Sequence, residues 1–272
     1  MRREKIGWLQ GKSMIEFVVI VESSADARTA TKLAERVLVD KVEWLERDQL
    51  QYQFRWSGLE ENTEHSCWKD IKHIIELEKK SGFRLPKFLG RNRYSKEPLK
   101  ADAATSITII NLVSYLQKTR NIKALLLIRD LDNQPERRQG IEQARSVHIN
   151  RPPKLEIVIG TAERMREAWV LNGFIPSNQD EEQILKEITT QLKFNPCEES
   201  HRLRSNSLTE PDRIRNPKVV VEKLTGGKME REQQCWEETP LEYLRENGVH
   251  TGLTAYIDEI EERLIPIIGS AE

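Results

Sequence analysis

Three acidic side chains stand directly after two strongly apolar stretches of the chain. Glu22 follows the run 15–21, and Asp130 and Asp132 follow the run 124–128. Two aspartates separated by one residue of extended chain point to the same side, so both can approach one cation. Hard oxygen ligands at this density suit Mg²⁺ or Mn²⁺. The spacing therefore favours a divalent-metal site that these three carboxylates share.

Each of these acids, taken alone, has a simpler interpretation. A glutamate directly after a strand is more often a first-turn residue that complements the dipole of the next helix, and Asp26 has the same interpretation. Acids are also common at strand ends. The combination of Glu22 with the aspartate pair on separate strand–helix units is what favours a shared site. Glu163 and Glu167, in the helix expected after a third apolar run, are further candidates.

The apolar runs are the elements that must bring these acids together. The runs 15–21, 124–128 and 155–159 are almost entirely apolar and rich in β-branched residues, which is typical of strands buried on both faces of a parallel sheet. Helical segments separate them, and helical crossovers join parallel neighbours. We expect the third strand to end at Gly160. Because ligands of such a sheet bind beyond the carboxyl ends of its strands, we expect an α/β fold with its site at that edge.

The pattern divides the chain into three parts. Residues 1–13 fit no pattern and are expected to form an N-terminal extension, residues 14–175 the α/β core, and residues 176–272 a mainly helical part packed on that core. The apolar residues from Leu253 to Leu264 have the spacing of an amphipathic helix that packs on the core.

Composition limits the class of protein. The 272 residues are 38% hydrophobic and 32% charged, with a net charge of −1, which argues against coating of nucleic acid through bulk charge. No apolar run approaches the roughly 18 residues that span a bilayer, and no secretory leader is recognisable. The 3 cysteines are widely spaced and form neither a disulfide framework nor a zinc site. We expect a globular, cytoplasmic protein with no membrane part.

Positive charge is concentrated in two stretches, residues 134–154 and 200–218. Local basic patches bind phosphates without the whole protein being basic, although a solvated surface of mixed charge is the simpler interpretation. The arginines that we assign to nucleic-acid contacts are Arg137, Arg138, Arg202, Arg204, Arg213 and Arg215.

A glutamate after the first strand and a D-x-D after a later strand together resemble the signature of the Toprim family. The chain is most similar to small bacterial Toprim-like proteins of unknown function, related to the overcoming-lysogenization-defect nucleases and often encoded beside an ATPase. The resemblance runs thinly from about residue 15 to 268. The segments that carry it are Val19-Ile20-Val21-Glu22, Leu127-Ile128-Arg129-Asp130-Leu131-Asp132, Arg166-Glu167-Ala168-Trp169-Val170-Leu171 and Asn216-Pro217-Lys218.

Two positions depart from the family pattern. Ser23 stands where the family has glycine after the glutamate, and Arg129 stands before the D-x-D where the family often has an apolar residue. Neither change removes a carboxylate, but both bear on the geometry of the site and leave open a degenerate site.

The resemblance implies a nuclease that cleaves phosphodiester bonds with Mg²⁺ or Mn²⁺, as the effector of a bacterial anti-phage defence system with an ATPase partner. By resemblance, Asp130 and Asp132 hold metal, and Glu22 shares a metal or acts as the general base. Glu167 is a further ligand, with Glu163 as its alternative. Lys218 supplies positive charge to the transition state, although a surface lysine at a helix start fits equally well. The choice between DNA and RNA, and whether the chain forms a homo-oligomer, stay open.

Two other interpretations stay open as well. A non-catalytic Toprim-like subunit of an ATPase complex fits the near-zero net charge and the acidic stretch near the C-terminus. The sequence Asp130-Leu131-Asp132-Asn133 also resembles the nucleophile motif of haloacid-dehalogenase-like phosphatases. That family has Thr or Val two residues after the second aspartate, where this chain has Gln134 or Pro135.

Overall fold

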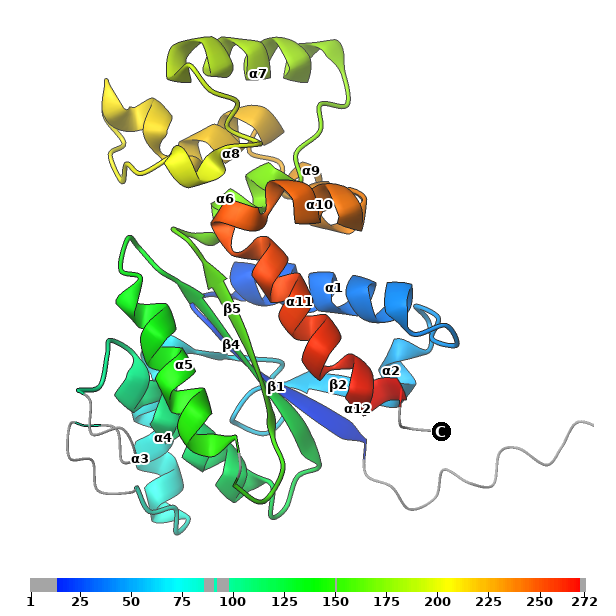
Figure 1. Ribbon diagram of the computed structural model, residues 1–272, viewed down its shortest axis with the longest axis vertical. Helices are drawn as coiled ribbons and strands as arrows, with labels where there is room; N and C mark the ends of the chain where they lie inside the picture. Colours follow the sequence, from blue (N-terminus) through cyan, green and yellow to red (C-terminus); the bar gives the residue numbers. More distant parts are fainter. Residues whose placement is uncertain (1–13, 86–90, 92–97, 150, 270–272) are drawn as a thin grey trace, which may run out of the picture.

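The computed structural model describes residues 14–85, 91, 98–149 and 151–269 and contains one five-stranded sheet (Figure 1). Its strands pair in the order β2-β1-β4-β5, and β3 pairs with the end of β1. Every pairing between these strands is parallel, so the predicted parallel α/β fold is confirmed. The strands are β1 (Ile15–Val21), β2 (Phe54–Ser57), β3 (Ser66–Cys67), β4 (Ile122–Asp130) and β5 (Glu156–Ala162).

Helices cover both faces of the sheet. In Figure 1, α3, α4 and α5 lie on one face, and α1 and α11 lie on the other. The α-helices are α1 (Ser24–Lys41), α2 (Leu50–Gln53), α3 (Ile71–Lys80), α4 (Ala103–Leu116), α5 (Glu136–His148), α6 (Arg166–Asn172), α7 (Gln179–Leu192), α8 (Pro217–Thr225), α9 (Met229–Glu237), α10 (Leu241–Asn247), α11 (Leu253–Arg263) and α12 (Ile265–Gly269). Short 3₁₀ helices are η1 (Trp68–Asp70), η2 (Ser200–Arg202), η3 (Asp212–Arg215) and η4 (Val249–Thr251).

Strand β1 shows why the sheet lies at the centre of the molecule. Phe17 and Val19 pack into the hydrophobic cluster on the side of α1, whereas Val18 and Ile20 pack into the cluster on the side of α3 and α4. None of the four side chains is exposed to solvent. Burial on both faces favours apolar residues, which explains the continuous apolar run from Phe17 to Val21, whereas the one acid of the strand, Glu16, is buried at its amino end.

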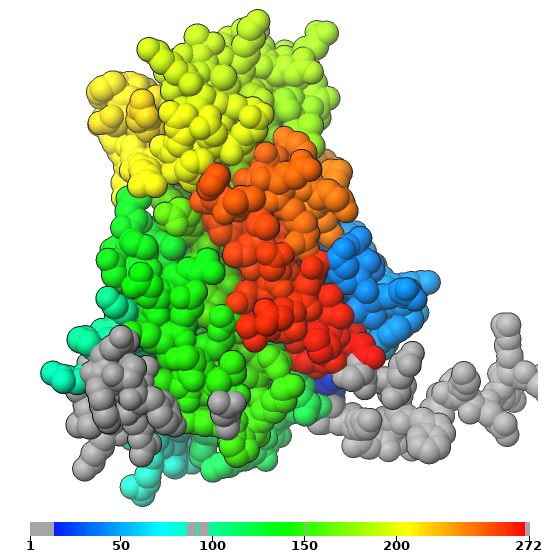
Figure 2. Space-filling model, in the orientation of Figure 1, coloured from blue at the N-terminus to red at the C-terminus, as the bar shows by residue number. Residues whose placement is uncertain are grey.

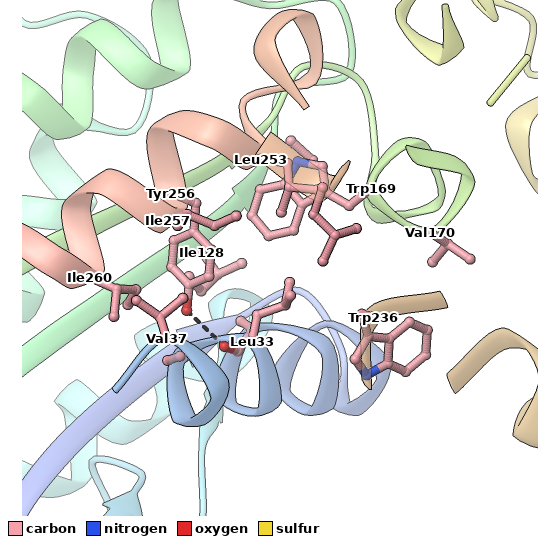
Figure 3. Close-up of a cluster of buried hydrophobic side chains, with 14 of the residues drawn as sticks. Leu33, Val37, Ile128, Trp169, Val170, Trp236, Leu253, Tyr256, Ile257 and Ile260 are labelled. Carbon is pink, nitrogen blue, oxygen red and sulfur yellow. Dashed lines mark hydrogen bonds between the residues drawn. The ribbon is translucent and has the colours of Figure 1, made fainter. Parts of the chain in front are cut away.

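Helix α11 closes the other face of the sheet through Tyr256 (Figure 3). The phenol of Tyr256 donates a hydrogen bond of 2.9 Å to the carbonyl of Ala30 in α1 and its ring stacks on Trp169 at 5.2 Å. A Cβ atom on Gly160 would lie 2.6 Å from Ile128 and 2.8 Å from Tyr256. The prediction that Gly160 ends the third strand is therefore wrong. This glycine lies within β5, where it makes room for α11.

The C-terminal helices join segments that are far apart in the sequence. In Figure 2 the orange and red C-terminal residues lie between the blue surface of α1 and the green surface of α5. Arg145 of α5 pairs with Glu259 of α11 at 2.6 Å. Glu259 also accepts the backbone N–H of Ile159 at 3.4 Å. These contacts satisfy part of the outer edge of β5, which pairs with a strand on one side only.

Other sequence-based expectations differ from the structure or fall outside it. The polar–aromatic alternation over 51–56 predicts one strand, but its first half is the helix α2 and only the second half belongs to β2. The extension 1–13 lies outside the described residues, as does most of the loop expected over 81–98. No helix in the described ranges is long and apolar enough to cross a membrane.

Candidate metal and phosphate site

Strand pairing brings Glu22 and Asp130 to the same edge of the sheet. Strands β1 and β4 are parallel neighbours, with Ile20 opposite Leu127, so their carboxyl ends meet. Glu22 directly follows β1, and Asp130 is the last residue of β4 rather than part of the loop after it. Asp130 is held in place by the start of α6, because its Oδ1 accepts the backbone N–H of Arg166 at 3.0 Å.

Asp130 lies in an excess of negative charge. Burial is the largest cause that raises the pKa of its carboxyl, which reaches about 8. The charges of four neighbouring acids raise this pKa further, and they are Asp26, Glu167, Glu22 and Asp132. Glu22, Asp132 and Glu167, which the sequence pattern singled out, therefore lie near Asp130, as does Asp26 of α1.

Glu22 is paired with an arginine of the neighbouring strand. Arg129 of β4 donates to the Glu22 carboxylate and, at 2.8 Å, to Asp102. Burial raises the pKa of Glu22 although the charge of Arg129 opposes the shift. Asp102 precedes α4 in a left-handed backbone conformation with a φ of 63°. Sequence reasoning missed Asp102, because no apolar strand precedes it and only the fold brings it to this edge.

Asp132 has its own arginine. Arg137 of α5 donates to the Asp132 carboxylate at 2.8 Å and to the backbone carbonyl of Asp130 at 2.8 Å. Its Nε atom also lies 3.8 Å from Asp102. Arg129 and Arg137 therefore both contact Asp102, and together they link Glu22 with Asp132 across the edge.

Asp130 and Asp132 do not point to the same side of an extended chain, so this prediction from the sequence is wrong. Asp132 has a φ of 48°, in the left-handed region, and lies in a turn. Leu131 is 3% exposed, and its backbone N–H donates to the carbonyl of Ala162 at 3.0 Å. Since Leu131 is drawn into the core, the chain turns directly after it. The two aspartates still interact, because the charge of Asp132 raises the pKa of Asp130.

Arg166 supplies positive charge to three acids around it. Its guanidinium lies 3.7 Å from Asp26, 3.6 Å from Glu167 and 2.6 Å from Glu232. These acids come from α1, α6 and α9, so one buried cation joins the edge of the sheet to the C-terminal helices. Helix α6 places Glu167 here because Arg166 and Glu167 form its first turn.

Glu163 and Lys218 do not have the surroundings that we expected. Glu163 precedes α6, whose N-cap is Met165, and its backbone N–H donates to the carbonyl of Thr251 at 2.9 Å. The helical spacing that made Glu163 an alternative to Glu167 is therefore wrong. Lys218 is exposed in the first turn of α8. In the described part of the chain, no hydrogen bond or ion pair joins its ammonium group to the acids around Asp130.

The remaining candidate arginines lie on the surface. Arg138 and Arg202 pair with glutamates on their own helical turns at 2.9 and 2.8 Å. Arg204 donates to a backbone carbonyl at 3.3 Å. Arg213 and Arg215 are exposed in η3. Their assignment to nucleic-acid contacts stays a prediction.

The carboxylate groups around Asp130 are ligands that suit a hard divalent cation, although arginines contact most of them in this structure. Within the described ranges, no group of three or more His, Cys, Asp or Glu side chains is arranged to hold a metal ion. Arg129, Arg137 and Arg166 contact the carboxylates instead. Burial is the largest cause of the raised pKa of Asp130, and the charges of the four neighbouring acids raise it further despite these arginines. Carboxylate oxygens in excess of nearby cations are the ligands that Mg²⁺ and Mn²⁺ prefer.

Comparisons with family models, curated proteins and solved structures find no match to this chain.

Proposed function

We propose that this protein is a metal-dependent nuclease of the Toprim type, which cleaves phosphodiester bonds with Mg²⁺ or Mn²⁺. The observation that supports this most is the excess of acids around Asp130 at the carboxyl edge of a parallel sheet. Ligands of such sheets bind at this edge. Burial, together with the charges of four neighbouring acids, raises the pKa of Asp130 to about 8, and a divalent cation would compensate the charge of these acids.

Each acid has a role in this proposal. Asp130 and Asp132 would hold the cation, and Glu167 would be a further ligand. When bound, a divalent cation neutralises charge on a phosphate oxygen and makes water a better nucleophile. Glu22 is the general base, and burial raises the pKa of its carboxyl toward the range in which it takes a proton readily. Arg129 orients Glu22 through its hydrogen bond.

The biological setting of the proposal comes from the Toprim resemblance. Nucleic acid is the proposed substrate, an ATPase the proposed partner, and anti-phage defence the proposed context. Lys218 stays a candidate for the positive charge at the transition state. The exposed arginines of η3 would contact the nucleic-acid backbone, since they leave their guanidinium groups available at the surface.

Divalent-metal binding and cleavage test the proposal together. We expect the parent to bind Mn²⁺ in calorimetry and Asp130→Asn to lose that binding while it stays folded. Asp180→Asn, which removes an exposed acid from the first turn of α7, is the control and should bind Mn²⁺ like the parent. DNA and RNA substrates are then incubated with Mg²⁺ or with chelator, with and without an ATPase encoded beside the protein.

Glu22→Gln separates the catalytic role of this glutamate from a structural one. As a general base, Glu22 contributes about 10²–10⁴-fold in rate, and the amide should abolish detectable cleavage under single-turnover conditions. As a mere helix-start acid it contributes less than about 1 kcal/mol, and cleavage should stay within a few-fold of the parent. Cleavage by Glu22→Gln at the parental rate would contradict the proposed role.

A second candidate function is a non-catalytic subunit of an ATPase complex. It is favoured by the arginines, since Arg129 and Arg137 supply positive charge to Glu22 and Asp132 from within the chain. In that case the parent binds no Mn²⁺ and cleaves nothing. Its complex with the ATPase should then be unaffected by Asp130→Asn.

A further inference from the structure

Arg164, in the turn between β5 and α6, is a buried cation without a carboxylate partner. Its side chain is 2% exposed. One terminal nitrogen donates to the side-chain oxygen of Asn206. Its Nε and Nη1 atoms are buried and have no hydrogen-bond partner. No ion pair joins Arg164 to any acid among the residues that the structure describes.

Arg166, two residues further along the chain, shows what Arg164 lacks. Both side chains are buried, but Arg166 pairs with carboxylates from α1, α6 and α9. Buried charges in proteins are normally paired, because removing an ion from water costs far more than a single neutral hydrogen bond returns. The surroundings of Arg164 therefore lack an anion.

Arg164 lies next to the acids of the candidate site. Its backbone carbonyl accepts the N–H of Asp132 at 3.0 Å. The charge of Asp132 acts to raise the pKa of Arg164, and the charge of Arg204 acts to lower it, although burial has the largest effect and lowers it overall. The positive charges of Arg164 and Arg204 are therefore close enough to interact, and Arg164 lies beside Asp132 at the edge where the proposed reaction takes place.

Asn206 belongs to a loop that is hydrogen-bonded to neighbouring segments on both sides of this residue. The backbone N–H of Ser205 donates to the carbonyl of Arg215 at 3.1 Å, and the side-chain amide of Asn216 donates to the carbonyl of Ser207 at 3.2 Å. Asn206 itself contributes a neutral amide oxygen to Arg164. A neutral acceptor is a weak substitute for an anion, because hydrogen bonds between a guanidinium and a charged oxygen are roughly twice as strong.

We propose that Arg164 forms an anion subsite that binds a phosphoryl group beside Asp132, and that the side chain of Asn206 covers this subsite when no anion is bound. The planar guanidinium offers parallel N–H donors that match two phosphate oxygens. This inference deepens the proposed nuclease function and rests on it for the nature of the ligand. A nucleic-acid backbone and free phosphate share the chemistry that Arg164 recognises.

Phosphate binding in chelator tests the subsite without any dependence on metal or cleavage. The full chain is titrated by calorimetry with inorganic phosphate and, separately, with a short single-stranded oligonucleotide. Arg164→Lys keeps the positive charge but loses the two parallel N–H donors of the guanidinium, and it should weaken phosphate binding about tenfold or more. Asn206→Ala removes the cover and should tighten phosphate binding severalfold. Arg47→Lys, at an exposed arginine between α1 and α2, is the control and should match the parent.

The outcomes separate the ligand sources and the two proposals. An oligonucleotide that competes with phosphate identifies the nucleic-acid backbone as the ligand, whereas phosphate binding without competition identifies free phosphate; both results support the subsite. Phosphate affinity that a folded Arg164→Lys leaves unchanged would overturn it, as would a parent that binds no phosphate. If Arg164→Lys fails to fold, Asn206→Ala decides, since equal or weaker phosphate binding overturns the subsite.

Cleavage is read separately from phosphate binding. A parent that binds phosphate through Arg164 but cleaves no substrate supports the subsite and contradicts the nuclease proposal. A parent that cleaves nucleic acid, with phosphate binding that does not depend on Arg164, supports the nuclease proposal and overturns the subsite.

Discussion

Buried acids near the two ends of strand β1 have pKa values that are shifted in opposite directions. At the amino end, Glu16 is 4% exposed and is paired with Arg120 at 2.6 Å and with Arg55 at 2.8 Å. Burial by itself would raise the pKa of Glu16, but these two arginines outweigh it and lower the pKa. At the carboxyl end, beside Glu22, burial and neighbouring acids raise the pKa of Asp130 to about 8.

The difference lies in how many acids share each arginine. Two guanidinium groups face the single carboxylate of Glu16. At the carboxyl end, Arg129 is shared by two acids, and Arg166 is shared by three. The amino end is therefore a complete structural ion cluster. The carboxyl end keeps an excess of negative charge, which costs stability and is typical of a site whose ligand is positive.

The largest effect is expected at the amino end. Arg120→Met should reduce the free energy of unfolding by about 3–5 kcal/mol, because it leaves the buried charge of Glu16 largely uncompensated. Urea unfolding measures the loss. Adding Glu16→Gln to this variant should restore more than half of it, since no buried charge then remains. A double variant as unstable as Arg120→Met alone would contradict this account of the pair.

At the carboxyl end, removing a charge should stabilise the protein. The pKa of Asp130 is about 8 in the folded state against 3.8 for an ordinary aspartate. The folded protein therefore holds a proton that the unfolded chain releases, and stability falls as pH rises from about 4 to about 8. The variant Asp130→Asn has no carboxyl group at this position and does not lose stability in this way. Its free energy of unfolding should therefore exceed that of the parent by an amount that grows across this pH range to about 1–3 kcal/mol.

Thermal melts of the parent and Asp130→Asn at both ends of this pH range, in chelator, measure the effect. Asp180→Asn on α7 again serves as the control, and its stability relative to the parent should not change between the two pH values. A variant that is less stable than the parent by the same amount at each pH would show that the pKa of Asp130 is not raised in the folded protein.

Arg137→Gln should have a smaller effect on stability and an opposite effect on metal affinity. Its partner Asp132 is 46% exposed, and an ion pair at the surface contributes at most about 1 kcal/mol. Removing the guanidinium should tighten Mn²⁺ binding up to about tenfold, because Mn²⁺ then no longer competes with Arg137 for the carboxylate of Asp132. Calorimetry with Mn²⁺ measures the change. Weaker Mn²⁺ binding in this variant would make Arg137 a support of the site rather than a competitor.

The smallest effect is expected for Arg55→Gln, at the exposed side of the amino-end cluster. The side chain of Arg55 is 56% exposed, so the pair with Glu16 should contribute only about 0.2–1 kcal/mol. Urea unfolding of Arg55→Gln and Arg120→Met under the same conditions compares the contributions of the two arginines that pair with Glu16. A loss as large as that of Arg120→Met would show that the two arginines compensate Glu16 equally.

The sheet and its acidic edge could be predicted from the sequence, because burial on two faces leaves a continuous apolar run. That pattern located β1, β4 and β5 and placed Glu22 and Asp130 at one edge. The boundaries were less predictable. Gly160 looked like a strand end, but it is a point of close contact with Tyr256, and such a contact involves residues far apart in the chain.

The charge balance of the site could not be predicted in the same way. Arg129 was visible in the sequence as a departure from the Toprim pattern, but its partner Asp102 was not. The left-handed turn at Asp132 and the burial of Arg164 were also hidden. Neither has a periodic signal, since each depends on how a loop packs against another part of the molecule.

The sequence by itself determined which elements form and at which edge the acids lie, because hydrophobic periodicity is a property of neighbouring residues. Only the tertiary structure decided which cation faces which acid. Arg129 and Glu22 lie 107 positions apart, and Arg166 and Asp26 come from different helices. Electrostatic compensation depends on the distance and direction between side chains, and both are set when the helices pack on the sheet.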